Sequence, residues 1–270
     1  MGRHKRGVAV KTIDKPGRVD ELYVKNDTLS VRINFHQKYS VNSYGWHNWV
    51  FDQYSFRKNI KVLELGCGTG DTWIGKEEKI PEGTKIILTD ISPLMSGKAV
   101  EKLEKNEKFS FELADIQNIP YADSEFEIVI ANHMLYHVPN LNKAISEIYR
   151  VLKKDGVFYS TTFGENSLKE LTDIYKKFED CAHFTYSKDV RFSLDNGEAV
   201  LGDYFEKTEK RLYIDSLEVT DSDDLVEYIV SYNDVPDNIC RKIKTITENE
   251  ISQNGSFKIS KEQGMFVCVK

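Results

Sequence analysis

The chain has 270 residues, of which 40% are hydrophobic and 30% charged, and it carries a formal net charge of −6. This composition is ordinary for a globular protein, and the length suits one large domain or one domain with a substantial insertion. No run of 18 apolar residues is present and the N-terminus lacks the apolar core of a signal peptide, so we expect a cytoplasmic protein without a membrane span.

The cysteines and the charge distribution narrow the possible functions. No C-x-x-C pair occurs among Cys67, Cys181, Cys240 and Cys268, which argues against a zinc site or a disulfide framework, and we expect no metal.

Residues 1–18 carry six basic residues and one acidic residue, so the rest of the chain is strongly acidic. A basic arm can contact RNA phosphates. Because the body is acidic, we favour a solvated terminus and do not expect a nucleic-acid partner.

Residues 32–56 hold a dense group of aromatic side chains. Phe35 and Tyr39 lie four residues apart, and Trp46, Trp49 and Val50 recur at helical spacing. We expect most of these rings to pack a pair of N-terminal helices onto a sheet.

The stretch 61–70, with sequence KVLELGCGTG, predicts a buried strand that runs into a glycine-rich turn. Glycine permits positive φ and leaves no Cβ, so backbone N–H groups can approach a ligand at the end of the strand. The spacing Glu64-x-Gly66-x-Gly68-x-Gly70 departs from the G-x-G-x-x-G pattern of dinucleotide sites. A nucleotide-like ligand other than a nicotinamide is therefore indicated.

Three more segments follow in order. Residues 85–90 predict a strand ending in Asp90, and an acid at the end of the second strand of a doubly wound sheet can accept both ribose hydroxyls. Residues 109–116 alternate like a strand and end in Ala-Asp-Ile. Residues 126–132 predict a strand that leads into His-Met-Leu-Tyr-His-Val, followed by a helix over 141–152 and a strand from 153.

Together these segments, about residues 60–163, resemble motifs I to IV of the class I S-adenosylmethionine (SAM) dependent methyltransferases. They are most similar to the small-molecule group that includes the quinone C-methyltransferases. The resemblance implies an α/β fold: a Rossmann-like, doubly wound, seven-stranded sheet with its last strand antiparallel and with helical cover insertions. It also implies SAM as cofactor.

The resemblance assigns SAM contacts to these residues: Tyr39, Glu64, Gly66, Cys67, Gly68, Gly70, Asp90, Ile91, Met95, Asp115, Ile116 and Asn132. Asp115 would take the adenine amino group and Ile116 would pack on the ring. Tyr39 would lie near the sulfonium, where a ring face favours a cation, and Trp46 is a possible wall of the acceptor site. Residues 71–74 are expected to open the first crossover helix, whose N–H groups would favour the methionine carboxylate.

The segment after the fourth strand would lie nearest the transferred methyl group. His133, Tyr136 and His137 are its candidate catalytic residues. Either histidine could act as a general base, since its pKa is near neutral without tuning. Alternatively, His137 supports the loop through hydrogen bonds, and the sequence leaves both interpretations open.

The predicted organisation has an N-terminal arm and lid helices over 1–56 and a SAM-binding domain over 57–270. Segments 164–200 and 220–255 are expected to cover the acceptor, because about 45 residues with two helices separate the last two strands, far more than a hairpin loop needs. The expected function is methyl transfer to an O, N or C atom of a small molecule. The alternatives are an RNA or protein methyltransferase that uses the basic arm, or a SAM-binding module without catalysis. The sequence does not indicate an oligomeric state.

Overall fold

The computed structural model describes residues 28–178, 190–232 and 235–270. The basic arm over residues 1–18, and with it the prediction for its role, lies outside the described residues. Within the described ranges, no helix is long and apolar enough to cross a membrane.

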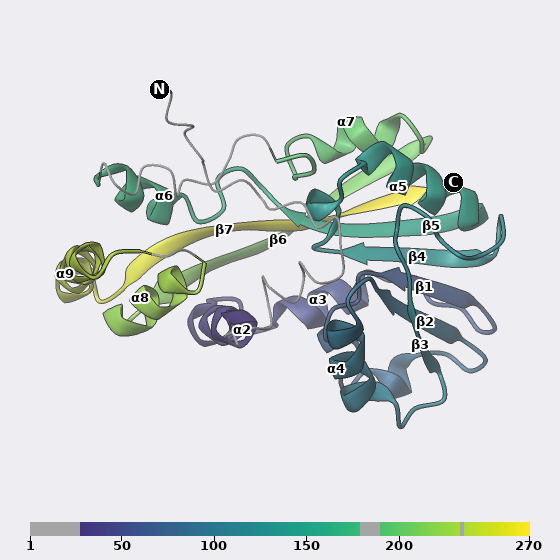
Figure 1. Ribbon diagram of the computed structural model, residues 1–270, viewed down its shortest axis with the longest axis horizontal. Helices are drawn as coiled ribbons and strands as arrows, with labels where there is room; N and C mark the ends of the chain where they lie inside the picture. The colour runs from purple at the N-terminus through teal and green to yellow at the C-terminus, as the bar shows by residue number, and fades with distance from the viewer. Residues whose placement is uncertain (1–27, 179–189, 233–234) are drawn as a thin grey trace.

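One seven-stranded sheet forms the centre of the molecule, in the order β3-β2-β1-β4-β5-β7-β6 (Figure 1). Five strands run parallel, namely β1 (Lys61–Leu65), β2 (Lys85–Asp90), β3 (Phe109–Leu113), β4 (Phe126–Asn132) and β5 (Leu152–Phe163). The last strand, β7 (Phe257–Val269), is antiparallel to both β5 and β6 (Lys207–Val219). This topology confirms the predicted Rossmann-like fold.

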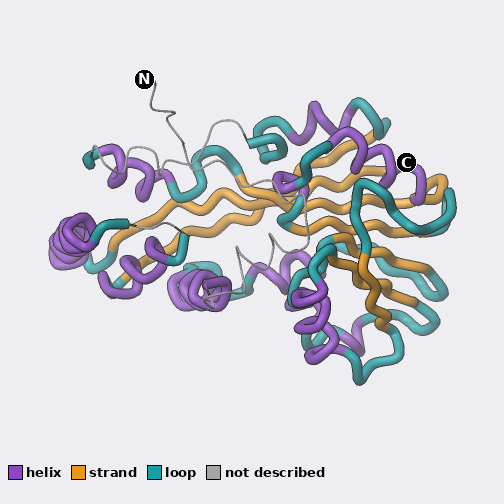
Figure 2. Tube along the Cα trace, viewed as in Figure 1, coloured by secondary structure: helices purple, strands orange, loops and turns teal. Residues whose placement is uncertain are grey.

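The central strands are apolar because helices cover both faces of the sheet (Figure 2). On one face, α5 (Leu141–Val151) and α7 (Gly197–Gly202) pack over β4 and β5. On the other face, α3 (Trp46–Asp52) and α4 (Pro93–Leu103) pack around the buried Trp73. Helix α4 is capped by Ser92, whose side chain accepts a hydrogen bond from the Met95 N–H at 3.2 Å.

The segment between β1 and β2 differs from the prediction. The expected crossover helix is replaced by two single 3₁₀ turns, η1 (Asp71–Trp73) and η2 (Glu77–Lys79). Gly70 and Gly75 both have positive φ, at 73° and 69°, and Ile74 between them is extended. These conformations leave room for one turn only, so no long helix N-terminus faces the end of β1.

The strands β6 and β7 have 13 residues each, and they stay paired from Lys207 with Val269 to Val219 with Phe257. Strand β5 pairs with β7 only as far as Gln263, so the outer halves of β6 and β7 extend beyond the rest of the sheet (Figure 1). Four helices pack on this extension: α2 (Thr28–Tyr39), α6 (Lys169–Lys176), α8 (Ser222–Val230) and α9 (Asp237–Asn254). We call the outer strand halves and these helices the distal lobe.

Candidate functional site

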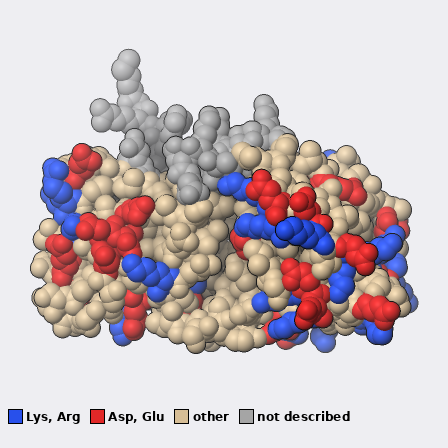
Figure 3. Space-filling view, turned by 90° about the horizontal axis from the view of Figure 1, so that it is seen from below, with Lys and Arg blue, Asp and Glu red and all other residues tan. Residues whose placement is uncertain are grey.

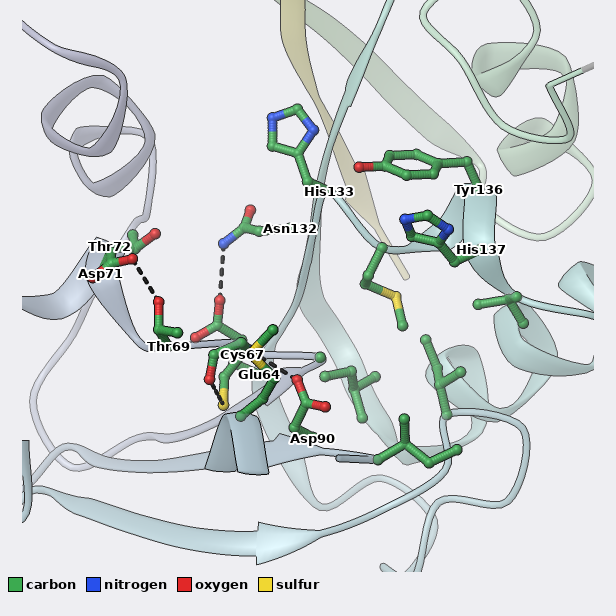
Figure 4. Close-up of a pocket in the computed structure, with 18 of the residues that line it drawn as sticks. Glu64, Cys67, Thr69, Asp71, Thr72, Asp90, Asn132, His133, Tyr136 and His137 are labelled. Atoms are coloured by element: carbon green, nitrogen blue, oxygen red, sulfur yellow. Dashed lines mark hydrogen bonds between the residues drawn. The ribbon is translucent and has the colours of Figure 1, made fainter. Parts of the chain in front are cut away.

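A cavity of about 330 Å³ opens beyond the carboxyl ends of β1, β2 and β4 (Figure 4). This edge is where open α/β sheets bind their ligands, and the volume is that of a small-molecule site. The lining comes from the loops that follow four parallel strands and from helices α2 and α3. One cavity therefore joins the glycine-rich loop to the segment after β4.

The glycine-rich loop presents its backbone to this cavity. Gly66 and Gly68 both line it and both have positive φ, at 69° and 57°. Apart from the two chain neighbours of Gly68, no residue has a heavy atom within 4 Å of the place where a Cβ would lie. This space is therefore open for a ligand. Gly70 was predicted to contact SAM, but it does not line the cavity. Its Cβ position lies 2.8 Å from Leu103 Cδ1, so Gly70 is needed for close packing against α4.

Asp90 lies at the end of β2 with both carboxylate oxygens engaged. Its Oδ2 accepts a hydrogen bond from the Gly68 N–H at 2.9 Å, and its Oδ1 accepts one from the Ser92 N–H at 2.8 Å. A carboxylate oxygen can accept a second hydrogen bond. Asp90 therefore fixes the glycine-rich loop and keeps capacity for the two hydroxyls of a ribose.

Glu64 and Asn132 join β1 to β4 at the back of the cavity. The Asn132 amide donates to Glu64 Oε1 at 2.9 Å (Figure 4). The indole N–H of Trp73 donates to Glu64 Oε2 at 2.5 Å. Burial raises the pKa of Glu64 to about 7, although these two hydrogen bonds act in the opposite direction. This pair forms a rigid polar wall of the cavity.

The remaining predicted cofactor contacts, apart from Tyr39, also line the cavity: Cys67, Ile91, Met95, Asp115 and Ile116. Burial raises the pKa of the Cys67 thiol well above its usual range, so this side chain is a neutral small group. Asp115 accepts a hydrogen bond from the Gln117 N–H at 2.8 Å, which fixes the turn after β3.

The three candidate catalytic residues line the opposite side of the cavity from Asp90 (Figure 4). His133 has a positive φ of 47°, and its N–H donates to the Thr161 carbonyl at 3.1 Å. Burial, together with the charges of His47 and Lys261, lowers the pKa of His133 to about 3. An imidazole with this pKa accepts a proton poorly near neutral pH, which argues against His133 as a general base. The rings of Tyr136 and His137 contact each other in a tilted arrangement, with centroids 4.5 Å apart and planes at 57°.

Tyr39 was predicted to contact SAM, but it does not line the cavity. Its ring packs on Phe35 at 5.0 Å, and its hydroxyl donates to Asp224 of α8 at 2.5 Å. Tyr39 faces the distal lobe because that lobe offers an apolar core and a carboxylate on the same side of α2.

The acceptor covers over segments 164–200 and 220–255 stay a prediction, since residues 179–189 and 233–234 of these segments lie outside the described residues. Neither segment 164–200 nor segment 220–255 contributes a described residue to the lining of the cavity. Helices α8 and α9 instead cover the outer ends of β6 and β7. The N-terminal helices do reach the cavity, through Leu29, Ile33 and Trp46.

Sequence analysis missed several lining residues. Leu29 and Ile33 lie four apart on one face of α2, a spacing that marks a shared face. His47 follows Trp46, and its Nδ1 lies 3.2 Å from the hydroxyl of Thr72, which also lines the cavity. The signal for His47 was its place in the aromatic span, next to a residue already assigned to the acceptor wall.

Comparison with known proteins agrees with this geometry. A family model described as a methyltransferase domain matches residues 56–208, which is more than half of the chain. The chain is 29% identical over 136 residues to a ubiquinone/menaquinone biosynthesis C-methyltransferase of Pectobacterium carotovorum, covering 49% of this chain and 54% of that protein. It is also 29% identical over 147 residues to a malonyl-[acyl-carrier protein] O-methyltransferase of Legionella pneumophila, covering 54% of this chain and 50% of that protein. The chain thus spans about half the length of these curated relatives.

The fold has relatives among solved structures. A phosphoethanolamine N-methyltransferase of Haemonchus contortus, solved in complex with SAM, superposes with a TM-score of 0.58 at 15% identity. The match covers 96% of this chain and 60% of that protein, and at this identity it shows a shared fold. With the family match over residues 56–208, we conclude that the chain belongs to the methyltransferase-domain family.

Proposed function

We propose that this protein transfers the methyl group of SAM to an O, N or C atom of a small-molecule acceptor. The observation that carries the proposal is a single cavity with two unlike sides. One side has the glycine-rich loop and Asp90, and the other has Trp46, His133, Tyr136 and His137. A donor and an acceptor bound in one such cavity would meet at its centre.

The residues present fit the cofactor. Asp90 would take the ribose hydroxyls, the open space at Gly68 would admit the backbone-facing part of the ligand, and Asp115 with Ile116 would hold the adenine. When bound, SAM supplies a methyl group activated by the positive sulfur. The chain's own contribution is alignment, which can supply on the order of 7–11 kcal/mol of the barrier.

Any proton that the acceptor loses must go to a nearby group or to water. His137 is the better candidate of the two histidines, because the low pKa of His133 makes it a poor proton acceptor. We expect His137→Gln to lower turnover while SAM affinity is kept. An equal loss of stability and of SAM affinity would instead favour a supporting role.

The class of acceptor rests on two further observations. The curated relatives carry names that describe transfer to a quinone precursor and to a malonyl carrier, that is, to carbon and to oxygen. Acidic and basic side chains are interspersed on the face drawn in Figure 3, and no broad surface of one sign is visible among the described residues there. Both favour a small-molecule acceptor over an RNA.

Isothermal titration with SAM, S-adenosylhomocysteine and NAD tests the first half of the proposal. We expect micromolar binding of the first two ligands and none of NAD, because the loop lacks the dinucleotide spacing. Transfer of labelled methyl from SAM to fractions of a small-molecule extract tests the second half. Binding of NAD alone would refute the assignment, and SAM binding without transfer to any fraction would favour a module without catalysis.

A further inference from the structure

The turn that follows β3 forms the part of the cavity wall where the proposed function places the adenine. Residues 114–117 all line this wall. Asp115 and Ile116 are the proposed adenine contacts, whereas Gln117 has no part in the proposed function. The Gln117 side chain contacts both Asp115 and the segment after β4, so it joins two walls of the cavity.

The orientation of the Gln117 amide follows from its partner on the segment after β4. The backbone N–H of Asn140 donates to Gln117 Oε1 at 3.1 Å. Because a backbone N–H can only donate, the oxygen end of the amide must face Asn140. The nitrogen end, which carries two N–H donors, therefore faces Asp115.

The two carboxylate oxygens of Asp115 are engaged unequally by Gln117. Oδ1 accepts hydrogen bonds from the Gln117 backbone N–H at 2.8 Å and from Gln117 Nε2 at 3.2 Å. Oδ2 lies 3.4 Å from the same Nε2, which is long for a hydrogen bond. Oδ2 thus keeps more capacity for a donor from a ligand. Since a carboxylate oxygen only accepts, it favours an amino group and disfavours a carbonyl oxygen in the same place.

The residue that anchors Gln117 is itself held firmly. Asn140 is the N-cap of α5, where its Oδ1 accepts a hydrogen bond from the Lys143 N–H at 3.1 Å. Its carbonyl accepts another from the Ala144 N–H at 3.1 Å. Helix α5 is packed in the core that covers β4 and β5. The oxygen end of the Gln117 amide is therefore held against a fixed point of the fold.

The rest of the turn is attached to α5 without the help of Gln117. The Ile119 N–H donates to Glu147 Oε2 at 2.9 Å, and Arg150 Nη2 donates to the Ile119 carbonyl at 2.9 Å. Arg150 Nη1 donates to the Tyr121 carbonyl at 2.8 Å. A substitution of Gln117 therefore tests its side-chain hydrogen bonds and leaves the attachment of the turn in place.

From these contacts we propose that Gln117 is a positioning residue that sets the preference of the cofactor site for an aminopurine. Its amide, anchored by Asn140, donates to Asp115 and holds the carboxylate with Oδ2 available to the exocyclic amino group. An oxopurine would place a second acceptor against this carboxylate. The proposal rests on the proposed function and adds a specificity-determining residue to its cofactor site.

Isothermal titration with S-adenosylhomocysteine and S-inosylhomocysteine tests the proposal. The two ligands differ at the purine, where a carbonyl oxygen replaces the exocyclic amino group. We expect the wild-type protein to bind S-adenosylhomocysteine roughly 100-fold more tightly or better, because a site built to accept a hydrogen bond rejects a ligand that cannot donate one.

Two variants separate the donor role of Gln117 from a bracing role. Gln117→Met removes both side-chain contacts and keeps a similar length. Gln117→Glu keeps an acceptor for the Asn140 N–H and removes the donor to Asp115. In both variants we expect the ratio of the two affinities to fall about tenfold, mainly through weaker binding of S-adenosylhomocysteine. Thermal unfolding should stay close to that of the wild type.

The matched control is Gln53→Met, at the end of α3. Both ends of the Gln53 amide are also engaged, since Nε2 donates to the Trp49 carbonyl at 3.0 Å and Oε1 accepts from Arg211 at 3.3 Å. Gln53 does not line the cavity. The control should therefore leave the ratio of affinities unchanged.

The outcomes separate this proposal from the function on which it rests. An unchanged ratio in both Gln117 variants would overturn the proposal. A fall confined to Gln117→Met would also overturn it, because the contact with Asn140 would then be what matters. A fall confined to Gln117→Glu would do the same, since the added charge would explain it.

The wild-type protein gives the remaining outcomes. Equal affinity for the two ligands would overturn the proposal, while intact binding of S-adenosylhomocysteine would leave the proposed methyl transfer standing. A wild-type protein that binds no S-adenosylhomocysteine would instead overturn the proposed function itself.

Discussion

The two sides of the cavity are built by different means. The cofactor side uses short loops directly after β1, β2 and β3, and much of its surface is backbone. The opposite side uses side chains from α2, from α3 and from the segment after β4, which are far apart in the sequence. A fixed cofactor can be bound by local turns, whereas a specific acceptor needs side chains that only the tertiary fold brings together.

The distal lobe should be more sensitive to the loss of a single charge than either side of the cavity. Lys261→Met would leave Asp215 buried without its cation, because the two side chains are 5% and 0% exposed. Breaking such a pair typically costs about 3–5 kcal/mol of unfolding free energy. Urea denaturation measures this, and the double variant Lys261→Met/Asp215→Asn should recover most of the loss. If the single variant is as stable as the wild type, the pair does not stabilise the distal lobe.

On the cofactor side, the group whose charge most affects stability is Glu64. Its pKa is raised by burial from 4.5 to about 7, so the folded protein binds the proton more tightly than the unfolded chain. Stability from this group is fully present below about pH 4.5 and is lost as the pH rises through about 7, by up to about 3 kcal/mol.

Thermal unfolding of the wild type and of Glu64→Gln between pH 4.5 and 7 checks whether the stability contributed by Glu64 falls as the pH rises. The glutamine variant removes the titration, so its stability should fall less between pH 4.5 and 7. A steeper fall in the variant than in the wild type would contradict the assignment.

A pair of glycines tests whether the cofactor side binds through its backbone. Gly68 and Gly75 have φ of 57° and 69°, and a Cβ at either position would meet nothing within 4 Å. Alanine at either residue should therefore cost a similar strain, about 1–2 kcal/mol. Only Gly68 lines the cavity, so Gly68→Ala should weaken SAM binding roughly tenfold, or about 1.4 kcal/mol. Equal SAM affinities in the two variants, measured by titration, would show that the loop is not the contact.

The smallest expected effect concerns Tyr39, which faces the distal lobe and not the cavity. Tyr39→Phe keeps the ring packing on Phe35 and removes the hydrogen bond to Asp224. We expect a loss of about 1 kcal/mol in unfolding free energy and unchanged SAM affinity. If the variant instead has normal stability and binds SAM more weakly, the result would support the predicted contact between Tyr39 and the sulfonium.

The sequence predicted the parts of the site that depend on local rules. Glu64, Gly66, Asp90 and Asn132 lie at or directly after strand ends, where topology alone determines which edge of the sheet they reach. Gly70 met the same pattern but serves packing, since its neighbour Leu103 comes from α4 and is not visible in the motif.

Predictions failed where orientation depends on distant residues. The face of α2 that carries Tyr39 is chosen by Asp224 and Tyr228, which lie almost 190 residues further along the chain. The outer halves of β6 and β7 pack against α2, α6, α8 and α9, and these contacts between distant segments left no motif in the sequence.

The unbroken pairing of β6 with β7 has a consequence for how this protein can change in evolution. Successive residues of a strand alternate between the two faces, so Tyr213, Asp215, Lys261 and Gln263 share one face only while the register is kept. Deleting one residue of β7 between these positions and the end of β5 would break this shared face, so Lys261 and Asp215 would no longer be opposite each other. The turn region between the two strands, by contrast, can lose or gain residues without moving either side chain. Insertions should therefore accumulate at the tip, where α8 and α9 lie, and substitutions in the two strands should occur in opposite pairs such as Asp215 and Lys261.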